Sequence, residues 1–222
     1  MTAVLFGSIS TIADTSEMQR HAFNDAFAEH GLDWSWDQDE YRRMLTSNGG
    51  RDRIAAYAED RGESVDADAV HATKSRLFQQ ALAGTDLEPR SGVVRTVREA
   101  REGNHQVALV TTTSPENVEA LLTAVSAHLD RDSFDLVLDR ETVDGEGKPD
   151  PAAYTQALER LGAGSSDAVA VEDNAGGVSA AVAAGIVCAA FPNQNTADHQ
   201  FPGASSVLDH LDLHALRGLT QS

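Results

Sequence analysis

The chain has 222 residues, of which 41% are hydrophobic, so it is long and apolar enough for one large or two modest domains. Its 17 basic and 35 acidic residues leave a formal net charge of −18. A surface this acidic argues against binding to nucleic acid or to anionic membranes, because both require clustered lysine and arginine. The acidity and the scarcity of lysine fit a salt-adapted source and an ordinary acidic protein about equally.

The single cysteine, Cys188, excludes an intramolecular disulfide and fits a reducing compartment. It lies in an apolar run, where a small buried hydrophobe is its expected role. The N-terminus has no basic segment before an apolar stretch, and no apolar window approaches the roughly 18 residues of a membrane span. We therefore expect a cytoplasmic protein.

The first predicted element is a buried parallel strand in the apolar run Ala3–Phe6. Small, turn-prone residues follow at Gly7, Ser8 and Ser10. A strand that ends at small residues and turns toward a helix is where α/β proteins place their ligands. This turn contains no carboxylate, histidine or cysteine.

Helical patterns without a convincing strand fill the next part of the chain, residues 16–84. Ser16 is expected to cap the first helix. Trp34 and Trp36 are expected to join an apolar core rather than to form a stacking platform. The predicted helices are 16–31, 37–46, 51–61 and 66–83.

Helices and strands alternate from residue 90 to residue 192, which predicts β-α-β units around a parallel sheet that the first strand rejoins. The fold class is therefore α/β, with a Rossmann-like parallel sheet core in residues 1–15 and 85–222 and an inserted helical cap in residues 16–84. Residues 207–211 predict a last short strand or helix. The predicted strands are 107–110, 134–138, 168–171 and 186–190, and the predicted helices are 93–101, 115–128, 151–161 and 178–184.

Polar residues stand where several of these strands end, and the carboxyl ends of parallel strands share one edge of a sheet. Thr111 can donate a hydrogen bond to a phosphoryl oxygen, and Lys148 can neutralise its charge. Glu172 and Asp173 are oxygen ligands of the kind Mg²⁺ prefers. Each has a simpler explanation. A helix cap at 111–114 explains Thr111, a solvated loop lysine explains Lys148, and a polar strand end that caps the next helix explains Glu172 and Asp173. Together they favour a shared anion site.

The order of these features resembles the haloacid dehalogenase superfamily, and more narrowly its phosphoglycolate phosphatase and β-phosphoglucomutase-like (CbbY-like) branch. The motifs that carry the resemblance are Gly-Lys-Pro-Asp-Pro at 147–151 and Val-Glu-Asp-Asn-x-x-Gly-x-x-Ala-Ala at 171–181. A threonine at a strand end and a helical insertion after the first strand complete it. The resemblance covers nearly the whole chain.

Members of this family carry an Asp-x-Asp-x-Thr loop, whose first aspartate attacks phosphorus and whose second acts as general acid and base. The resemblance implies that Thr111, Thr112 and Lys148 hold the phosphoryl group. It implies that Glu172 and Asp173 help to hold Mg²⁺ with the first aspartate and a loop carbonyl. Arg51 resembles a cap residue that grips a second anionic group, although a helix-surface arginine explains it equally well.

The corresponding loop of this chain reads Gly7-Ser8-Ile9-Ser10-Thr11. Gly7 takes the place of the nucleophile and Ile9 that of the acid/base, and neither can perform that chemistry. The affinity for Mg²⁺ should fall with the loss of a bridging carboxylate. Asp14 lies too far along the chain to substitute, and Gln19 stands where the family usually has a cap-helix histidine.

Three hypotheses follow. The first is a catalytically impaired relative that binds a small phosphorylated metabolite, or a protein partner, without turnover. The second is an active hydrolase of the phosphatase or phosphomutase type, in which Mg²⁺ near Glu172 and Asp173 activates water directly. The third is a protein-interaction role in which the old site is a relic. Retention of Lys148 in a chain with one other lysine argues mildly against the relic.

Overall fold

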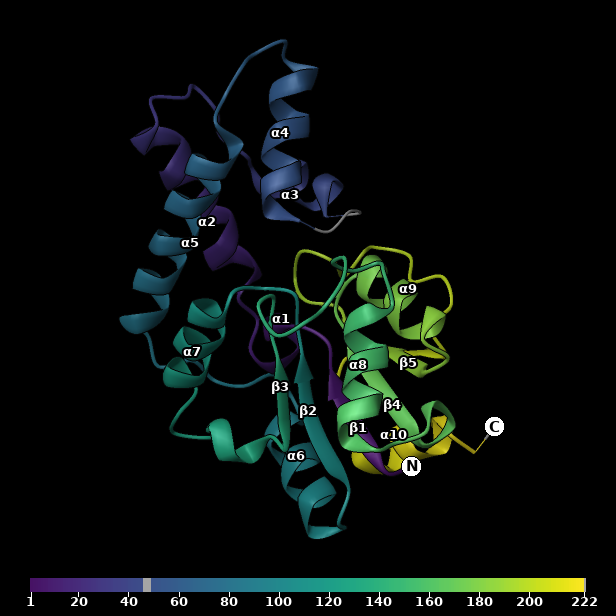
Figure 1. The fold of residues 1–222 in the computed structure, drawn as a ribbon. Helices are drawn as coiled ribbons and strands as arrows, with labels where there is room; N and C mark the ends of the chain where they lie inside the picture. The colour runs from purple at the N-terminus through teal and green to yellow at the C-terminus, as the bar shows by residue number, and fades with distance from the viewer. Residues whose placement is uncertain (46–48, 222) are drawn as a thin grey trace.

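A fully parallel six-stranded sheet forms the centre of the molecule (Figure 1). The structure is a computed structural model, and it describes residues 1–45 and 49–221. The strand order is β3-β2-β1-β4-β5-β6, so β1 lies between β2 and β4. This arrangement confirms the predicted α/β, Rossmann-like fold class. The strands are β1 (Ala3–Phe6), β2 (Gln106–Val110), β3 (Leu136–Leu138), β4 (Ala168–Glu172), β5 (Val187–Ala190) and β6 (Ser206–Val207).

The two faces of the sheet are covered by different helices, because successive side chains of a strand point to opposite sides. On β1, Val4 and Phe6 join the cluster that contains α6 (Val93–Glu102), α7 (Pro115–Ala124) and α10 (Leu213–Leu219). Ala3 and Leu5 join the opposite cluster with α8 (Ala152–Leu161) and α9 (Ala175–Ala183). Cys188 is buried in this second cluster, as predicted, and burial raises the pKa of its thiol.

A separate helical part, which we call the cap, lies above the carboxyl edge of the sheet in Figure 1. It has an aromatic core in which Trp36 lies 4.6 Å from the ring of Phe27, and Trp34 lies 5.3 Å from the same ring. Both tryptophans are core residues, as predicted. The cap helices are α2 (Ser16–Glu29), α3 (Gln38–Met44), α4 (Gly50–Asp60) and α5 (Ala67–Ala83).

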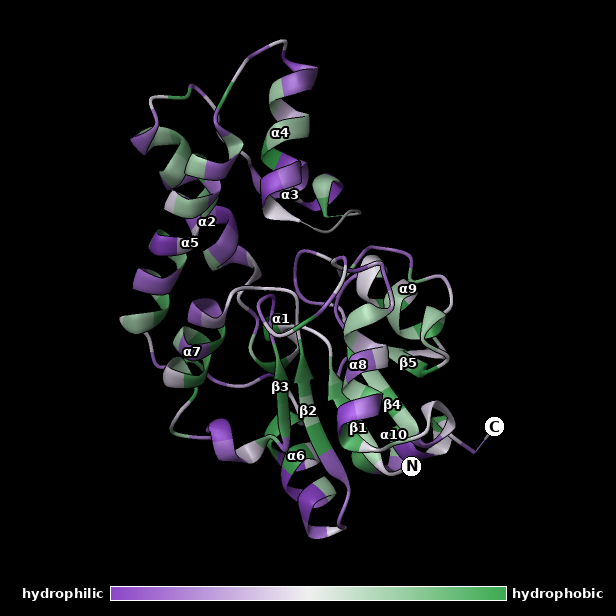
Figure 2. Ribbon diagram, viewed as in Figure 1, coloured by the Kyte–Doolittle hydropathy of each residue, from purple (hydrophilic) through white to green (hydrophobic). Residues whose placement is uncertain are grey.

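Two chain segments join the cap to the rest of the molecule, before α2 and after α5. They lie side by side, because the Arg90 amide donates a hydrogen bond of 2.8 Å to the Ile12 carbonyl. The division at residues 15 and 85 remains our prediction. Figure 2 shows the strands of the sheet as hydrophobic and the outer helix faces as largely hydrophilic. No helix within residues 1–45 and 49–221 combines the length and apolarity of a membrane span.

Several predicted helix ends need correction. Ser16 does not cap α2: it is the first helical residue, and the Asp14 carboxylate accepts from its amide at 3.0 Å. α7 ends at Ala124, earlier than predicted, and α9 starts at Ala175 because Asn174 caps it by accepting from the Gly177 amide. Residue 46 of the predicted helix 37–46 lies outside the described residues.

Two short α-helices were not predicted from the sequence. The turn after β1 contains a single helical turn, α1 (Ile9–Ile12), because the Ser8 hydroxyl oxygen accepts from the Thr11 amide at 3.2 Å. At the other end of the chain, β6 is only two residues long, and Asp212 caps α10, which was not predicted. Both helices depend on a side-chain cap rather than on a long apolar pattern.

Candidate functional site

Gly7 lies at the centre of the candidate site because it follows the central strand. Its amide donates 2.8 Å to the Val171 carbonyl of β4, and its carbonyl accepts from the Lys148 ammonium. The register aligns Phe6 with Leu109 on one side and with Val171 on the other. Residues after β1, β2 and β4 therefore meet at one edge of the sheet, as predicted.

Lys148 is a buried lysine, 6% exposed, that links three of these elements. Besides the Gly7 carbonyl, its Nζ donates 2.8 Å to the Val110 carbonyl and 2.6 Å to Glu172 Oε1. It also lies 4.6 Å above the ring of Tyr154. The alternative of a solvated loop lysine is therefore wrong.

Glu172 is fully buried, and its carboxylate lies in the space beside Gly7. Its Oε1 accepts from Lys148 and, at 2.8 Å, from the Tyr154 hydroxyl. Burial raises the pKa of Glu172, and the charge of Lys148 opposes this rise. Burial, followed by the charge of Glu172, raises the pKa of Tyr154 well above its ordinary value, so the phenol remains a donor.

Two glycines make room for this carboxylate. A Cβ atom added at Gly7 would lie 2.1 Å from Glu172 Oε1 and 2.3 Å from the Tyr154 hydroxyl. A Cβ atom added at Gly177 would lie 2.1 Å from Glu172 Oε2. Glu172 thus fills the volume that a side chain at residue 7 would need.

Asp173 is almost fully buried and accepts from three side chains. Its Oδ1 accepts from the Ser8 hydroxyl at 2.8 Å and from the Asn174 amide at 3.0 Å. Its Oδ2 accepts from the Asn193 amide at 2.8 Å. Asp173 therefore joins the loop after β1 to the loop after β5, while Asn174 performs the helix-capping role considered for this strand end.

The threonines after β2 lie at the same edge. Thr111 is buried, and its hydroxyl oxygen accepts from the Thr113 amide at 3.2 Å. Thr112 is half-buried. Ser114, not Thr111, caps α7, because its side chain accepts from the Asn117 amide. Helix capping therefore does not explain Thr111 or Thr112, and their phosphate-binding role stays a prediction.

Arg51 does not join this cluster through any contact between described residues. Its guanidinium is half-exposed and pairs within the cap with Asp52 at 3.1 Å and with Asp68 at 3.2 Å. Hydrogen bonds to Asp68 and Asp52 raise its pKa. The grip on a second anionic group stays a prediction.

A partly buried polar chain runs from the cap to the loop after β1. Lys74 Nζ donates 3.1 Å to Gln19 Oε1, and Gln19 Nε2 donates 3.3 Å to Thr15 Oγ1. The hydroxyls of Thr15 and Ser10 lie 2.7 Å apart. Burial lowers the pKa of Lys74 to about 7. The position usually filled by histidine in the resembling family thus carries a glutamine that binds a lysine.

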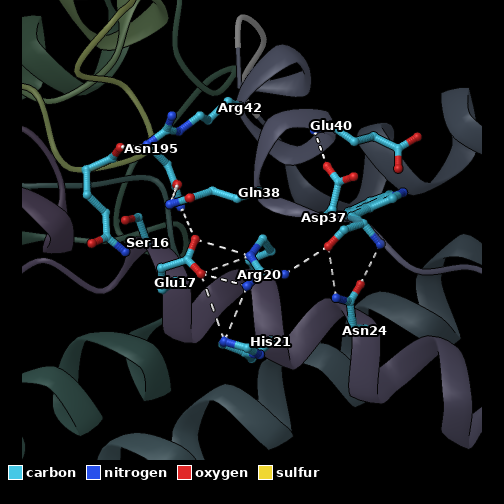
Figure 3. Close-up of polar contacts among 12 residues, drawn as sticks. Ser16, Glu17, Arg20, His21, Asn24, Asp37, Gln38, Glu40, Arg42 and Asn195 are labelled. Carbon is cyan, nitrogen blue, oxygen red and sulfur yellow. Dashed lines mark hydrogen bonds and ion pairs between the residues drawn. The ribbon is translucent and has the colours of Figure 1, made fainter.

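A second set of polar contacts joins the cap to the loop after β5 (Figure 3). Asn195 donates 2.7 Å to Glu17 and accepts 3.0 Å from Gln38. Arg42 donates 2.7 Å to the Gln194 carbonyl. The hydrogen bond from Arg20 is the largest cause of the lowered pKa of Glu17. The cap is therefore held against the edge that carries Asp173.

Sequence reasoning missed Arg90, which holds together both loops of the site. Its guanidinium donates 3.1 Å to the Ser10 carbonyl and 2.8 Å to the Phe191 carbonyl, and it also donates to the Pro192 carbonyl. It lies 3.5 Å over the Phe191 ring. Backbone carbonyls are its partners, so no motif could have signalled it.

Similar proteins are known for nearly the whole chain. A family model described as a hydrolase, haloacid dehalogenase-like hydrolase, matches residues 1–185. Protein CbbY of Cereibacter sphaeroides is 38% identical over 222 residues, which cover 98% of this chain and 96% of that protein. A CBBY-like protein of Arabidopsis thaliana is 32% identical, covering 94% of this chain and 68% of its own length.

Solved structures agree with these relatives. The crystal structure of CbbY from Rhodobacter sphaeroides in complex with phosphate has a TM-score of 0.85 and 37% identity, covering 95% of this chain and 94% of that one. A mutant of the same protein in complex with xylulose-(1,5)bisphosphate gives the same values. These similarities are consistent with a magnesium cofactor.

Proposed function

Since this chain belongs to the haloacid dehalogenase-like hydrolase family, we propose that it binds a small phosphorylated sugar without hydrolysing it through a covalent intermediate. The proposed site is the carboxyl edge of the sheet, with Thr111, Thr112 and Lys148 as anion-binding groups. Support for the ligand class comes from the CbbY structures that contain phosphate and xylulose-(1,5)bisphosphate.

One observation carries the proposal: the Lys148 ammonium contacts the carbonyl of Gly7 itself. The cation proposed to hold the phosphoryl group therefore lies against the residue that has no side chain to attack it. A covalent route needs an oxygen nucleophile at this place. Glycine supplies none, and Ile9 cannot move a proton.

No neighbouring carboxylate in the described residues is placed to take over. Glu172 is 0% exposed and is held by Lys148 and Tyr154. Asp14 accepts from Ser16 and, at 3.0 Å, from the Gln194 amide. These contacts disfavour the alternative of an active hydrolase that uses water activated near Glu172 and Asp173. No contact between residues that the structure describes favours the interaction-only alternative.

The test combines binding with turnover. Thermal unfolding with xylulose-(1,5)bisphosphate and a panel of sugar phosphates should raise Tm for at least one ligand, because a ligand that binds only the folded state stabilises it. Phosphate release should stay at the level of a protein-free control. Ligand-dependent turnover by the unmodified chain would contradict the proposal.

The two lysines provide matched variants. Lys148→Met should abolish the ligand-dependent rise in Tm, whereas Lys74→Met should retain it, because Lys74 reaches the loop after β1 only indirectly, through Gln19 and Thr15. Loss of the rise in both variants, with folding intact by circular dichroism, would count against an anion site centred on Lys148.

A further inference from the structure

The space that a nucleophile would occupy is already filled by a carboxylate of this chain. Glu172 Oε1 lies 2.1 Å from where a Cβ atom of residue 7 would stand. Lys148, at 2.6 Å, and the Tyr154 hydroxyl, at 2.8 Å, fix this oxygen. The negative charge beside Gly7 is therefore neutralised by an ammonium group and needs no metal ion.

The remaining carboxylate oxygens do not form a cation site. Both oxygens of Asp173 accept hydrogen bonds from side chains. Glu172 Oε2 lies against Gly177 in the first turn of α9 and has no hydrogen-bond partner among the described residues. Residues 1–45 and 49–221 contain no group of three or more His, Cys, Asp or Glu that could hold a metal ion. Mg²⁺ prefers near-octahedral oxygen coordination, which this donor set does not supply.

The charge of the site leads to the same conclusion. Where the resembling family has two aspartates, this loop has Gly7 and Ile9, so two negative charges are missing. A bound Mg²⁺ would contribute two positive charges. Without the metal, Glu172, Asp173 and Lys148 leave one net negative charge, the same as a complete family loop with its metal. An anion would therefore meet a similar net charge without any metal ion.

We propose that this chain binds phosphate without Mg²⁺, and that the Glu172–Lys148 ion pair beside Gly7 stands where a nucleophile and its metal would otherwise be. This inference rests on the proposed function, since it concerns the same anion site. It specifies the ligand as a phosphate group that arrives without a divalent cation.

The experiment titrates the full chain calorimetrically with inorganic phosphate, once in about 5 mM EDTA and once in about 5 mM MgCl₂, and separately with MgCl₂ alone. The two phosphate affinities are expected to agree within about twofold, and MgCl₂ alone is expected to give no binding heat. Phosphate binding at least about tenfold stronger with Mg²⁺ would overturn this inference and leave the proposed function standing. No phosphate binding in either buffer would overturn both.

A pair of variants sharpens the result. The double change Gly7→Asp, Ile9→Asp restores both missing charges, and the double change Gly7→Asn, Ile9→Asn matches its size without charge. Only the aspartate pair is expected to bind Mg²⁺ and to make phosphate binding depend on it. Mg²⁺ binding by both pairs, or by the unmodified chain, would overturn the inference.

A further variant avoids the crowded position 7, where these pairs could fail to fold. Glu172→Gln keeps the shape of the side chain and removes its charge, which frees Lys148 from its anionic partner. In EDTA, its affinity for inorganic phosphate is expected to rise several-fold over that of the unmodified chain. A loss of about tenfold or more would overturn the inference, because the Glu172 carboxylate would then support anion binding in the absence of a metal instead of competing with the anion for Lys148.

Discussion

The carboxyl edge of the sheet and the cap each bury one of the two lysines of this chain, and they do so differently. Lys148 donates to Glu172 and to two backbone carbonyls. Lys74 lies between the rings of Phe23 and Phe78, at 4.8 Å and 4.9 Å, and donates to Gln19. It forms no ion pair with any residue in the described part of the chain. The buried Lys148 ammonium therefore stabilises the sheet edge through its ion pair with Glu172. The buried Lys74 ammonium carries a desolvation cost in the cap that no ion pair within the described residues offsets.

Removing the paired lysine should produce the largest effect. Lys148→Met leaves Glu172 buried beside Gly7 without its ammonium partner. Loss of one member of a buried ion pair typically costs about 3–5 kcal/mol of unfolding free energy. Urea denaturation at neutral pH measures this loss. Adding Glu172→Gln should recover part of it, because no uncompensated carboxylate remains, and failure to recover would mean that the Lys148 carbonyl contacts dominate.

Filling the space at residue 7 should lower the free energy of unfolding by less than the loss of Lys148 does. Gly7→Ala adds a Cβ atom 2.1 Å from Glu172 Oε1, so the paired carboxylate must move. Overpacking of this kind costs about 1–3 kcal/mol. Urea denaturation gives the value, with Gly147→Ala as the matched control because a Cβ atom there meets nothing within 4 Å. Equal effects at the two glycines would contradict the idea that Glu172 fills this space.

Removing the cap lysine, Lys74, should instead raise the free energy of unfolding. Burial, and then the charge of Arg53, lowers the pKa of Lys74 to about 7 from its ordinary 10.5. Between these pH values the unfolded chain binds a proton that the folded chain does not, so stability rises with pH. Lys74→Met removes this dependence and should be more stable than the unmodified chain by about 1–2 kcal/mol near pH 6.

The pH profile separates this cause from a simple packing gain. The advantage of Lys74→Met should shrink steadily from about pH 7 upward and approach zero near pH 10. Burial, with the charges of Lys74, Arg140 and Arg53, lowers the pKa of His71 to about 4, so this neighbour stays neutral throughout the range. An advantage that does not change with pH would mean that Lys74 is not the titrating group.

The comparison also shows which features the sequence can predict. The alternation of apolar runs locates β1, β2 and β4, and parallel strands share an edge, so Gly7, Lys148 and Glu172 could be brought together in advance. The direction of the Glu172 side chain could not be predicted, because it depends on the space beside Gly7 and Gly177 and on the Tyr154 hydroxyl. Arg90 was hidden for a similar reason, since its partners are carbonyls of distant segments.

Arg51 should give the smallest effect on stability. Its ion pairs with Asp52 and Asp68 lie on an exposed part of the cap, and exposed pairs contribute little. Arg51→Ala should therefore leave Tm unchanged within error. If Arg51 grips a second anionic group, the variant should bind xylulose-(1,5)bisphosphate more weakly than the unmodified chain, while its affinity for inorganic phosphate stays the same.

Arg61→Ala is the matched control for this last measurement. Arg61 is also a half-exposed cap arginine in a surface ion pair, with Glu63 at 2.7 Å. The variant removes the same charge from the cap surface as Arg51→Ala does. It should alter neither affinity, because Arg61 lies at a different place on the cap. Equal weakening of bisphosphate binding in both variants would point to the overall charge of the cap, because two residues with different neighbours would then act alike. A selective loss in Arg51→Ala would instead place the second anion-binding group in the cap, opposite Lys148 at the sheet edge.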